Sequence, residues 1–309
     1  MTTPLHRPRR GAIIRRMTRF PCWAVVSGCI LAGSAAAYGQ EPSDTPRAGA
    51  VAHAGAPPIP LSTGVAKRLR SGDPAQIRGA LDEVRTSGKG GVAAASTIIE
   101  LLRQGMSPAL TQAAIETLGD VENEAASEVL GWYARHRNVE LRRSAVEALA
   151  KTRGPMAVRA LRSALSDSDA AVRGFAATAL GSTKAKDCVP DLFTALEHNV
   201  PEASAAIGEL CSDNECQRLA GRVGNIPFEI VTSGLEEALL RPASEVSDGA
   251  KIDIVERVRG VATAEANRFL KGVQKRWPAR GSRRVKQAID QAVTATIASP
   301  GSRGAQESP

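Results

Sequence analysis

The chain has 309 residues, of which 43% are hydrophobic and only 3% are aromatic. Alanine, leucine and valine dominate the apolar fraction and long β-branched runs are missing, which favours close-packed helices over a sheet. The formal net charge of +8 would suggest a nucleic-acid or membrane-surface binder. The placement of the charges removes most of that suggestion, because residues 1–39 carry +6, residues 271–309 carry +6, and residues 40–270 carry −4.

Residues 1–39 have the parts of a secretory signal peptide. Six arginines and no acid precede an apolar centre at 24–31, and small residues at 33–37 end in an Ala-x-Ala pattern. Cleavage after Ala37 or Gly39 would fit this pattern. We therefore predict export to the periplasm or cell envelope, or secretion.

Two other fates of this leader remain open. The sequence Val26-Ser-Gly-Cys29 resembles a lipoprotein box, in which Cys29 would be lipidated, although apolar residues continue beyond it. An uncleaved anchor is the third option, since the run 20–37 approaches the length of a membrane span. Its many small residues make that span a poor one.

The segments at both ends of the helical body have the composition of disordered chain. Residues 40–72 are rich in Pro, Ala, Gly and Ser, and residues 298–309 are similar. Such segments have too little apolar surface to offset the entropy of ordering them. They are predicted to be a flexible linker and a disordered tail.

Internal repetition is the most informative feature of the sequence. The segments 110–118, 141–149 and 172–180 resemble one another and follow at steps of 31 residues. A second ladder, at Val129-Leu130, Val158 to Leu161 and Val189 to Leu192, advances by about the same step. Within each segment the apolar residues fall at helical spacing, so each unit is predicted to be a helical hairpin.

The residues between the segments agree with hairpins. Gly119, Gly154 and Gly181 stand where the first helices are expected to end, and glycine is favoured at a C-terminal cap. Asp167 and Asp169 precede the next first helix and can cap it. Arg142 and Arg173 stand at the same position in successive units, and such turn acids are their expected partners. A single hairpin cannot bury its apolar side, so the hairpins must stack. The predicted fold is an all-α superhelix.

The unit from Ser166 to Gly181, followed by 187–196, resembles the short HEAT-like repeat found in phycobilisome lyases. Its Asp-x-x-Val-Arg start, Ala-x-x-Leu-Gly middle and Val-Pro-x-Leu second helix carry the resemblance. It implies HEAT-like repeats over residues 73–224 and degenerate helical repeats over 225–297, with a basic closing helix. Roughly six or seven hairpins would fill the chain.

Signals for catalysis are missing from the sequence. The four histidines, at 6, 53, 136 and 198, are not followed by Glu, unlike the metal ligands of a di-iron enzyme with HEAT-like repeats. There is no phosphate loop and no nucleophile elbow. We predict no enzyme activity, no metal and no cofactor.

Solenoids of this class bind partners along the concave face, which the second helices line. With Leu130, Leu161 and Leu192 taken as core, a helical wheel turns six side chains outward: Glu128, Trp132, Arg159, Arg162, Ser163 and Phe193. This composition is that of an interface hot spot. The alternative is that Trp132 and Phe193 fill gaps between hairpins.

A run without acidic residues makes the one strongly basic patch after the leader: Lys271, Lys275, Arg276, Arg280, Arg283, Arg284 and Lys286. A solvated helix face is its simplest explanation. Anionic lipid, an envelope polymer or the acidic solenoid of a second copy are the functional options, whereas nucleic acid is not expected, because aromatic residues for base stacking are scarce.

Three cysteines would remain after cleavage of the leader. Cys211 and Cys216 flank a predicted turn and can form a disulfide in an oxidising compartment, with free buried thiols as the alternative. Cys188 is expected to be buried.

These observations together favour a non-catalytic scaffold in the cell envelope that binds a protein or peptide. The alternative is an intracellular regulatory subunit or bilin-lyase-like enzyme whose N-terminus only resembles a leader.

Overall fold

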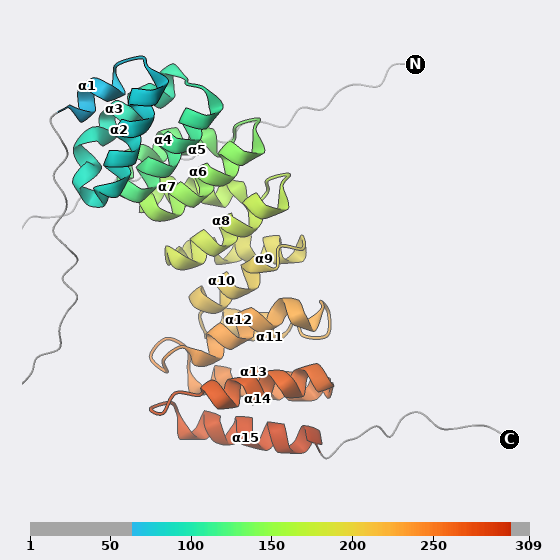
Figure 1. Cartoon of the computed structure of the whole chain (residues 1–309). Coiled ribbons are helices and arrows are strands. Elements are labelled where there is room, and N and C mark those ends of the chain that lie inside the picture. Colours follow the sequence, from blue (N-terminus) through green and yellow to red (C-terminus); the bar gives the residue numbers. More distant parts are fainter. Residues whose placement is uncertain (1–63, 298–309) are drawn as a thin grey trace, which may run out of the picture. The chain divides into compact units, whose positions relative to one another are not determined.

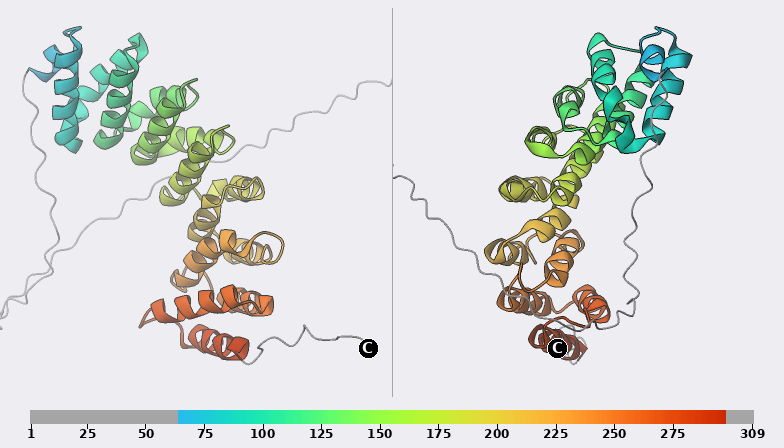
Figure 2. Two further views of the ribbon diagram at one scale, coloured as in Figure 1. Left: turned by 45° about the vertical axis from the view of Figure 1, so that its right-hand side comes forward. Right: turned by 90° about the vertical axis from the view of Figure 1, so that its left-hand side faces the viewer.

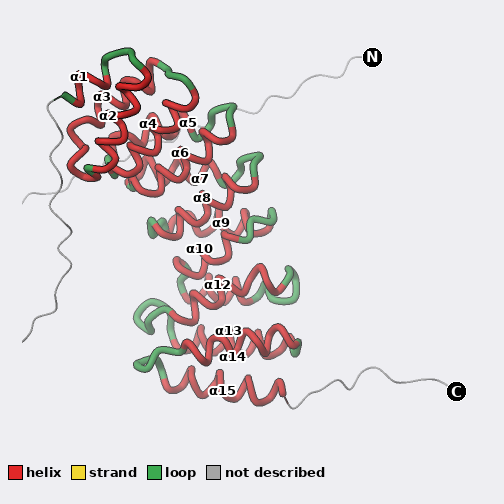
Figure 3. The backbone as a smooth tube through the Cα atoms, in the orientation of Figure 1, coloured by secondary structure: helices red, strands yellow, loops and turns green. Residues whose placement is uncertain are grey.

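Helices joined by short turns make up almost all of residues 64–297, the part of the chain that the computed structural model describes (Figure 1). The predicted leader with Cys29, most of the linker, and the tail at 298–309 lie outside the described residues. No strand occurs within 64–297, where Figure 3 draws only helices and loops. The predicted all-α fold is confirmed.

A short helix and seven helical hairpins follow one another along the described chain. The short helix is α1 (Val65–Leu69), and it lies inside the segment predicted as linker, so the ordered body begins earlier than residue 73. Val65 and Leu69 of α1 are buried, which is the physical reason that this end is ordered.

Each hairpin has a first and a second helix. The pairs are α2 (Pro74–Thr86) with α3 (Val92–Gln104), α4 (Pro108–Val121) with α5 (Ser127–Tyr133), α6 (Val139–Thr152) with α7 (Gly154–Ala164), α8 (Ala170–Ser182) with α9 (Val189–Glu197), α10 (Glu202–Leu210) with α11 (Asp213–Ala220), α12 (Phe228–Leu240) with α13 (Asp248–Val261), and α14 (Ala264–Arg276) with α15 (Arg283–Ile297). Single-turn 3-10 helices η1 (Gly88–Gly91), η2 (Glu124–Ala126) and η3 (Lys186–Cys188) precede α3, α5 and α9.

Polar residues start several of these helices, as their sequence positions require. The carboxylate of Asp73 accepts from the N–H of Ala75 at the start of α2, and Asn138 accepts from the N–H of Glu140 at the start of α6. Asp169 does the same for α8 by accepting from Val172. Such caps satisfy backbone donors that have no partner inside the helix.

The hairpins stack in sequence order, and the first helices form one continuous layer. Each first helix contacts the first helix of the next hairpin, from α2 through α4, α6, α8, α10 and α12 to α14. Second helices also pack on one another, as α3 does on α5 and α13 on α15. Both views of Figure 2 show each hairpin beside its neighbours in the sequence. One hydrophobic core therefore runs through the stack, as the solenoid prediction requires.

Two of the three glycines that were expected to cap first helices have another role. Gly119 lies inside α4, where a Cβ atom would come within 2.9 Å of the Cα of Ala148 in α6, and Gly181 makes a similar approach to Ala206. The residues with positive φ at the ends of α4 and α8 are instead Glu122 and Lys184, whereas after α6 both Arg153 and the predicted Gly154 have positive φ. Gly119 and Gly181 were wrongly assigned as caps because close helix packing also requires residues without side chains.

Beyond residue 200 the repeat does not degrade but lengthens to 35 residues. The starts of the second helices carry Ser212, Ser247 and Ser282, each 35 residues after the last. Ser247 accepts from the N–H of Ala250, and Ser282 accepts from the N–H of Val285, one step later. Buried positions follow the same step, as Leu235 and Leu270 show.

Candidate binding surface on the second helices

Trp132 is the most exposed large apolar side chain among the described residues, with 53% of its surface accessible. It lies on α5, and the guanidinium of Arg103 on α3 lies 5.7 Å from its ring centre. Arg103 also pairs with Glu128 on α5, with 3.3 Å between Nη2 and Oε2. The indole thus lies beside a bridge between two second helices, and a cation near the ring adds a modest attraction.

The next second helix, α7, adds a second apolar side chain. Met156 is 41% exposed, and the guanidinium of Arg159 lies against its sulfur. The helices α5 and α7 approach closely, because Gly131 faces Ala160. Neither Arg103 nor Met156 was predicted to belong to the site; Arg103 stands 29 residues before Trp132, close to the step of the repeat, and that spacing was the available signal.

Arg162 and Ser163 are exposed on α7, as predicted. Arg162 extends toward α9 and pairs with Asp191, with 2.8 Å between Nε and Oδ2. The positive charge of Arg162 is therefore largely neutralised by a carboxylate of the solenoid itself. Among the arginines of α3 and α7 named here, Arg159 is the one that has no carboxylate of a described residue within ion-pair distance.

Phe193 does not belong to this surface, and its prediction was wrong. The side chain is only 1% exposed, and the guanidinium of Arg218 covers its ring at 4.1 Å. The buried stripe of α9 runs through Val189, Phe193 and Leu196, spaced as one helix face. The prediction took Leu192 as the centre of the buried stripe. This choice turned the helical wheel by about one residue and placed Phe193 on the exposed side.

We call the exposed side of α3, α5 and α7 the second-helix surface; it carries Trp132, Met156, Arg103, Glu128 and Arg159. This surface combines two apolar side chains with a border of charge. Such a combination can bury apolar area against a partner while the charged border sets its orientation. Farther along the second helices, a groove of about 940 Å³ lies between α11 and α13 and is lined by Gln217, Asp253 and Arg257, among others.

The turns beside this surface hold a ladder of ion pairs. Arg142 makes two bonds of 2.9 Å to Asp167, as the prediction of a turn acid required. Asp169 pairs with Arg143 rather than Arg173, and the Arg143 guanidinium lowers the pKa of the Asp169 carboxyl to about 2. Arg173 instead donates to the backbone carbonyls of Asp167 and Ser168. Arg142 and Arg143 of α6 therefore join their hairpin to the next one.

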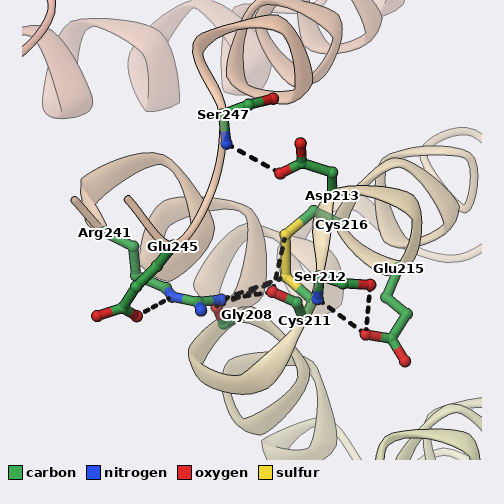
Figure 4. The surroundings of a disulfide bond; sticks show 9 residues. All are labelled: Gly208, Cys211, Ser212, Asp213, Glu215, Cys216, Arg241, Glu245 and Ser247. Atoms are coloured by element: carbon green, nitrogen blue, oxygen red, sulfur yellow. Dashed lines mark hydrogen bonds and ion pairs between the residues drawn. A yellow bond between two sulfur atoms is a disulfide. The ribbon is translucent and has the colours of Figure 1, made fainter. Parts of the chain in front are cut away.

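A disulfide joins Cys211 at the end of α10 to Cys216 in α11 (Figure 4). Arg241, which follows α12, donates to the carbonyls of Gly208 and Cys211 at 3.2 and 2.7 Å. In the same junction Asp213 accepts from the N–H of Ser247 at 2.9 Å. These hydrogen bonds therefore join the α10–α11 hairpin to the α12–α13 hairpin at the turn that the disulfide closes.

The remaining cysteine of the described chain, Cys188, is buried and free. Burial raises the pKa of its thiol, which keeps the thiol protonated and unreactive.

All seven residues of the predicted basic patch are exposed and lie on α14, on α15 or in the turn between them. One of them, Arg276, pairs with Glu236 on α12. The patch is therefore a property of the last hairpin and is separate from the second-helix surface around Trp132.

Within residues 64–297 no cluster of three or more His, Cys, Asp and Glu side chains is arranged to hold a metal ion. His136 stacks on Tyr133, with 5.8 Å between ring centres. None of the described helices is both long and apolar enough to span a bilayer.

The stacked hairpins define an α-helical repeat protein. Residues 95–170 and 158–240 match the family model for HEAT repeats, so this part of the chain contains HEAT repeats. No curated protein matches the sequence.

Solved structures with similar folds include a chain from the complex of CpcE and CpcF of phycocyanin lyase from Nostoc. It is 17% identical, the match covers 80% of this chain and 100% of that one, and the TM-score is 0.42. A designed armadillo repeat protein is 15% identical, with 75% and 98% of the two chains covered and a TM-score of 0.37.

Proposed function

We propose that this protein is a non-catalytic scaffold that binds a protein or peptide on its second-helix surface. The HEAT-repeat fold supports a role in protein interaction. The observation that carries the proposal is the exposure of Trp132 on α5 and of Met156 on α7, two second helices that pack on one another. A tryptophan left half in water lowers stability relative to a buried one, and a partner that covers it would recover that free energy.

The surrounding charges support a partner with both apolar and acidic groups. Arg159 has no carboxylate of a described residue within ion-pair distance, and Arg103 is shared between Glu128 and the indole ring. An acidic group on the partner can therefore pair with Arg159 without breaking a bridge inside the solenoid. Such charges act mainly on orientation and association rate.

A double variant, Trp132→Ala with Met156→Ala, tests the proposal. Both side chains are exposed, so the variant is expected to fold normally and to lose affinity for partners captured from an envelope extract by ~30-fold or more, the loss typical of a hot spot. Phe175→Ala is the matched control, because Phe175 is also 41% exposed but lies on the first helix α8. Equal recovery of partners by all three proteins would refute the assignment of the surface.

We also propose that the protein is exported and works in the cell envelope. The leader-like sequence at 1–39 supports this, and so does a disulfide that oxidising compartments permit. Mass spectrometry of the natural protein is the test, since it reports cleavage, lipidation at Cys29 and the state of Cys211 and Cys216 together. An intact Met1 with reduced cysteines in the cytosol would favour the alternative of an intracellular regulatory subunit or lyase-like protein.

A further inference from the structure

The last hairpin, α14–α15, carries a dense group of exposed cations. Residues 264–297 contain eight Lys and Arg residues against Glu265 and Asp290, a net charge of +6. Six of these cations are exposed and make no ion pair with any of the described residues. This set, which we call the end patch, is Lys271, Lys275, Arg280, Arg283, Arg284 and Lys286.

Several cations elsewhere in the solenoid join consecutive hairpins. Arg85 pairs with Glu116, Lys151 with Asp120, and Arg142 with Asp167, in each case across consecutive hairpins. Arg276 does the same toward Glu236, and it is for that reason outside the end patch. No cation of the end patch makes such an ion pair with a described residue.

The fold does not require cations at three of these positions. One 35-residue step earlier, the positions of Lys271, Arg280 and Arg283 hold Glu236, Glu245 and Asp248. The buried positions of the two hairpins keep their apolar character over the same step, as Ile254 and Ile289 illustrate. Three charges are thus reversed in register while the packing is retained.

Three members of the end patch also oppose the dipole of their helix. The first turn of α15 contains no acidic residue, and it carries Arg283, Arg284 and Lys286 instead. Positive charge at a helix N-terminus is unfavourable. Stability therefore gives no reason for this placement, whereas an external anionic partner would.

We propose that the end patch docks the protein on an anionic membrane surface. A specific protein partner would need an apolar anchor, and over residues 264–295 of this hairpin none of the large hydrophobic side chains is exposed; Phe269 and Trp277 are half-buried. Attraction to anionic lipid headgroups needs no such anchor and grows with each added Lys or Arg near the surface. The solenoid would then be held at the membrane by one end.

Binding of the full chain to lipid vesicles tests the proposal. We expect the chain to bind vesicles of phosphatidylcholine with 30% phosphatidylglycerol and to bind pure phosphatidylcholine weakly, with the difference reduced at high salt. The variant Lys271→Glu/Lys275→Glu/Lys286→Glu should lose affinity for the anionic vesicles by roughly a hundredfold. Its thermal melting should match that of the parent; if the triple Glu variant does not fold, the corresponding triple Gln variant takes its place.

The matched control is Lys67→Glu/Arg137→Glu/Lys186→Glu, which changes the same number of exposed cations elsewhere and retains the same leader. Both variants have a formal net charge of +2 in place of +8. The control should bind nearly as well as the parent. An equal loss in both variants, equal binding to neutral and anionic vesicles, or tighter binding to duplex DNA than to the anionic vesicles would overturn the proposal.

Discussion

Asp169 shows how one carboxylate serves two neighbouring hairpins. It caps α8 by accepting from the N–H of Val172, and it pairs with Arg143 of α6 at 2.9 Å. The ion pair is the larger cause of the low pKa, about 2, and the capping N–H is the second. Because this pKa lies below the ordinary value for aspartate, ionisation of Asp169 stabilises the folded chain.

The variant Asp169→Asn tests this linkage. Asparagine also caps helices, so the variant keeps the cap and loses the ion pair. The stabilisation by the charged group is fully present above about pH 4 and disappears as the pH falls through 2. The parent should therefore be the more stable protein at pH 6, and the two should converge near pH 2, as measured by urea unfolding. A difference that does not change with pH would contradict the assigned pKa.

Equivalent residues in successive repeats need not have equivalent contacts. Arg142 and Arg173 are one 31-residue step apart, but the counterpart of Asp167 one step later is His198. Arg142 therefore has a paired carboxylate, whereas Arg173 bonds to backbone carbonyls. The sequence predicted the first contact correctly because a carboxylate, Asp167, stands in the turn before α8.

At the scale of helices, glycines decide how closely the first helices approach. The clearest case is Gly119, whose position leaves no room for a Cβ atom against Ala148. By contrast, Gly79 lies on the exposed side of α2, where an added Cβ atom would meet no atom of a neighbouring segment within 4 Å. Two helical glycines in equivalent layers thus have opposite requirements.

We expect Gly119→Ala to lower the free energy of unfolding by about 1–3 kcal/mol, because the added methyl group must push α4 and α6 apart. Gly79→Ala should raise it by about 0.5–1 kcal/mol, since alanine loses less backbone entropy in a helix. Chemical denaturation of both variants measures the two changes. Destabilisation of similar size at both positions would mean that the close approach of α4 to α6 is not tight.

The lengthening of the repeat after residue 200 lies in the later second helices and in the turns that precede them. The helices α13 and α15 have 14 and 15 residues, whereas α5, α7 and α9 have 7, 11 and 9. The turn between α12 and α13 and that between α14 and α15 each extend over several residues, whereas α10 and α11 are separated by two. The disulfide closes this short turn, and Arg241 ties it to the next hairpin. The serines at the 35-residue step were visible in the sequence but could not be recognised while a 31-residue step was assumed.

For the molecule as a whole, stability depends on contacts between neighbouring hairpins. Leu161 in α7 and Leu69 in α1 are both fully buried, but the first lies in the middle of the stack and the second at its N-terminal end. In a repeat protein, loss of an interior contact weakens the interfaces on both sides, whereas loss at an end frees only the terminal unit.

Leu161→Ala should therefore lower the free energy of unfolding by about 2–5 kcal/mol. Hydrogen exchange should become faster in α5, α7 and their partners in the same core. For Leu69→Ala we expect faster exchange confined to α1 and the first hairpin. Exchange that rises uniformly along the chain in both variants would show that the stack unfolds as one unit instead of as coupled repeats.

The sequence alone determined the repeated helices, their pairing into hairpins and the 31-residue step, because each depends on residues close together in the chain. It also singled out the two cysteines that the structure joins, while free buried thiols stayed open as the alternative. Only the tertiary structure decided which side of α9 is buried, which glycines serve packing, and which arginine pairs with Asp169. These depend on the rotation and spacing of one hairpin against the next. A shift of one residue, about 100° around a helix, was enough to move Phe193 from the predicted surface into the core.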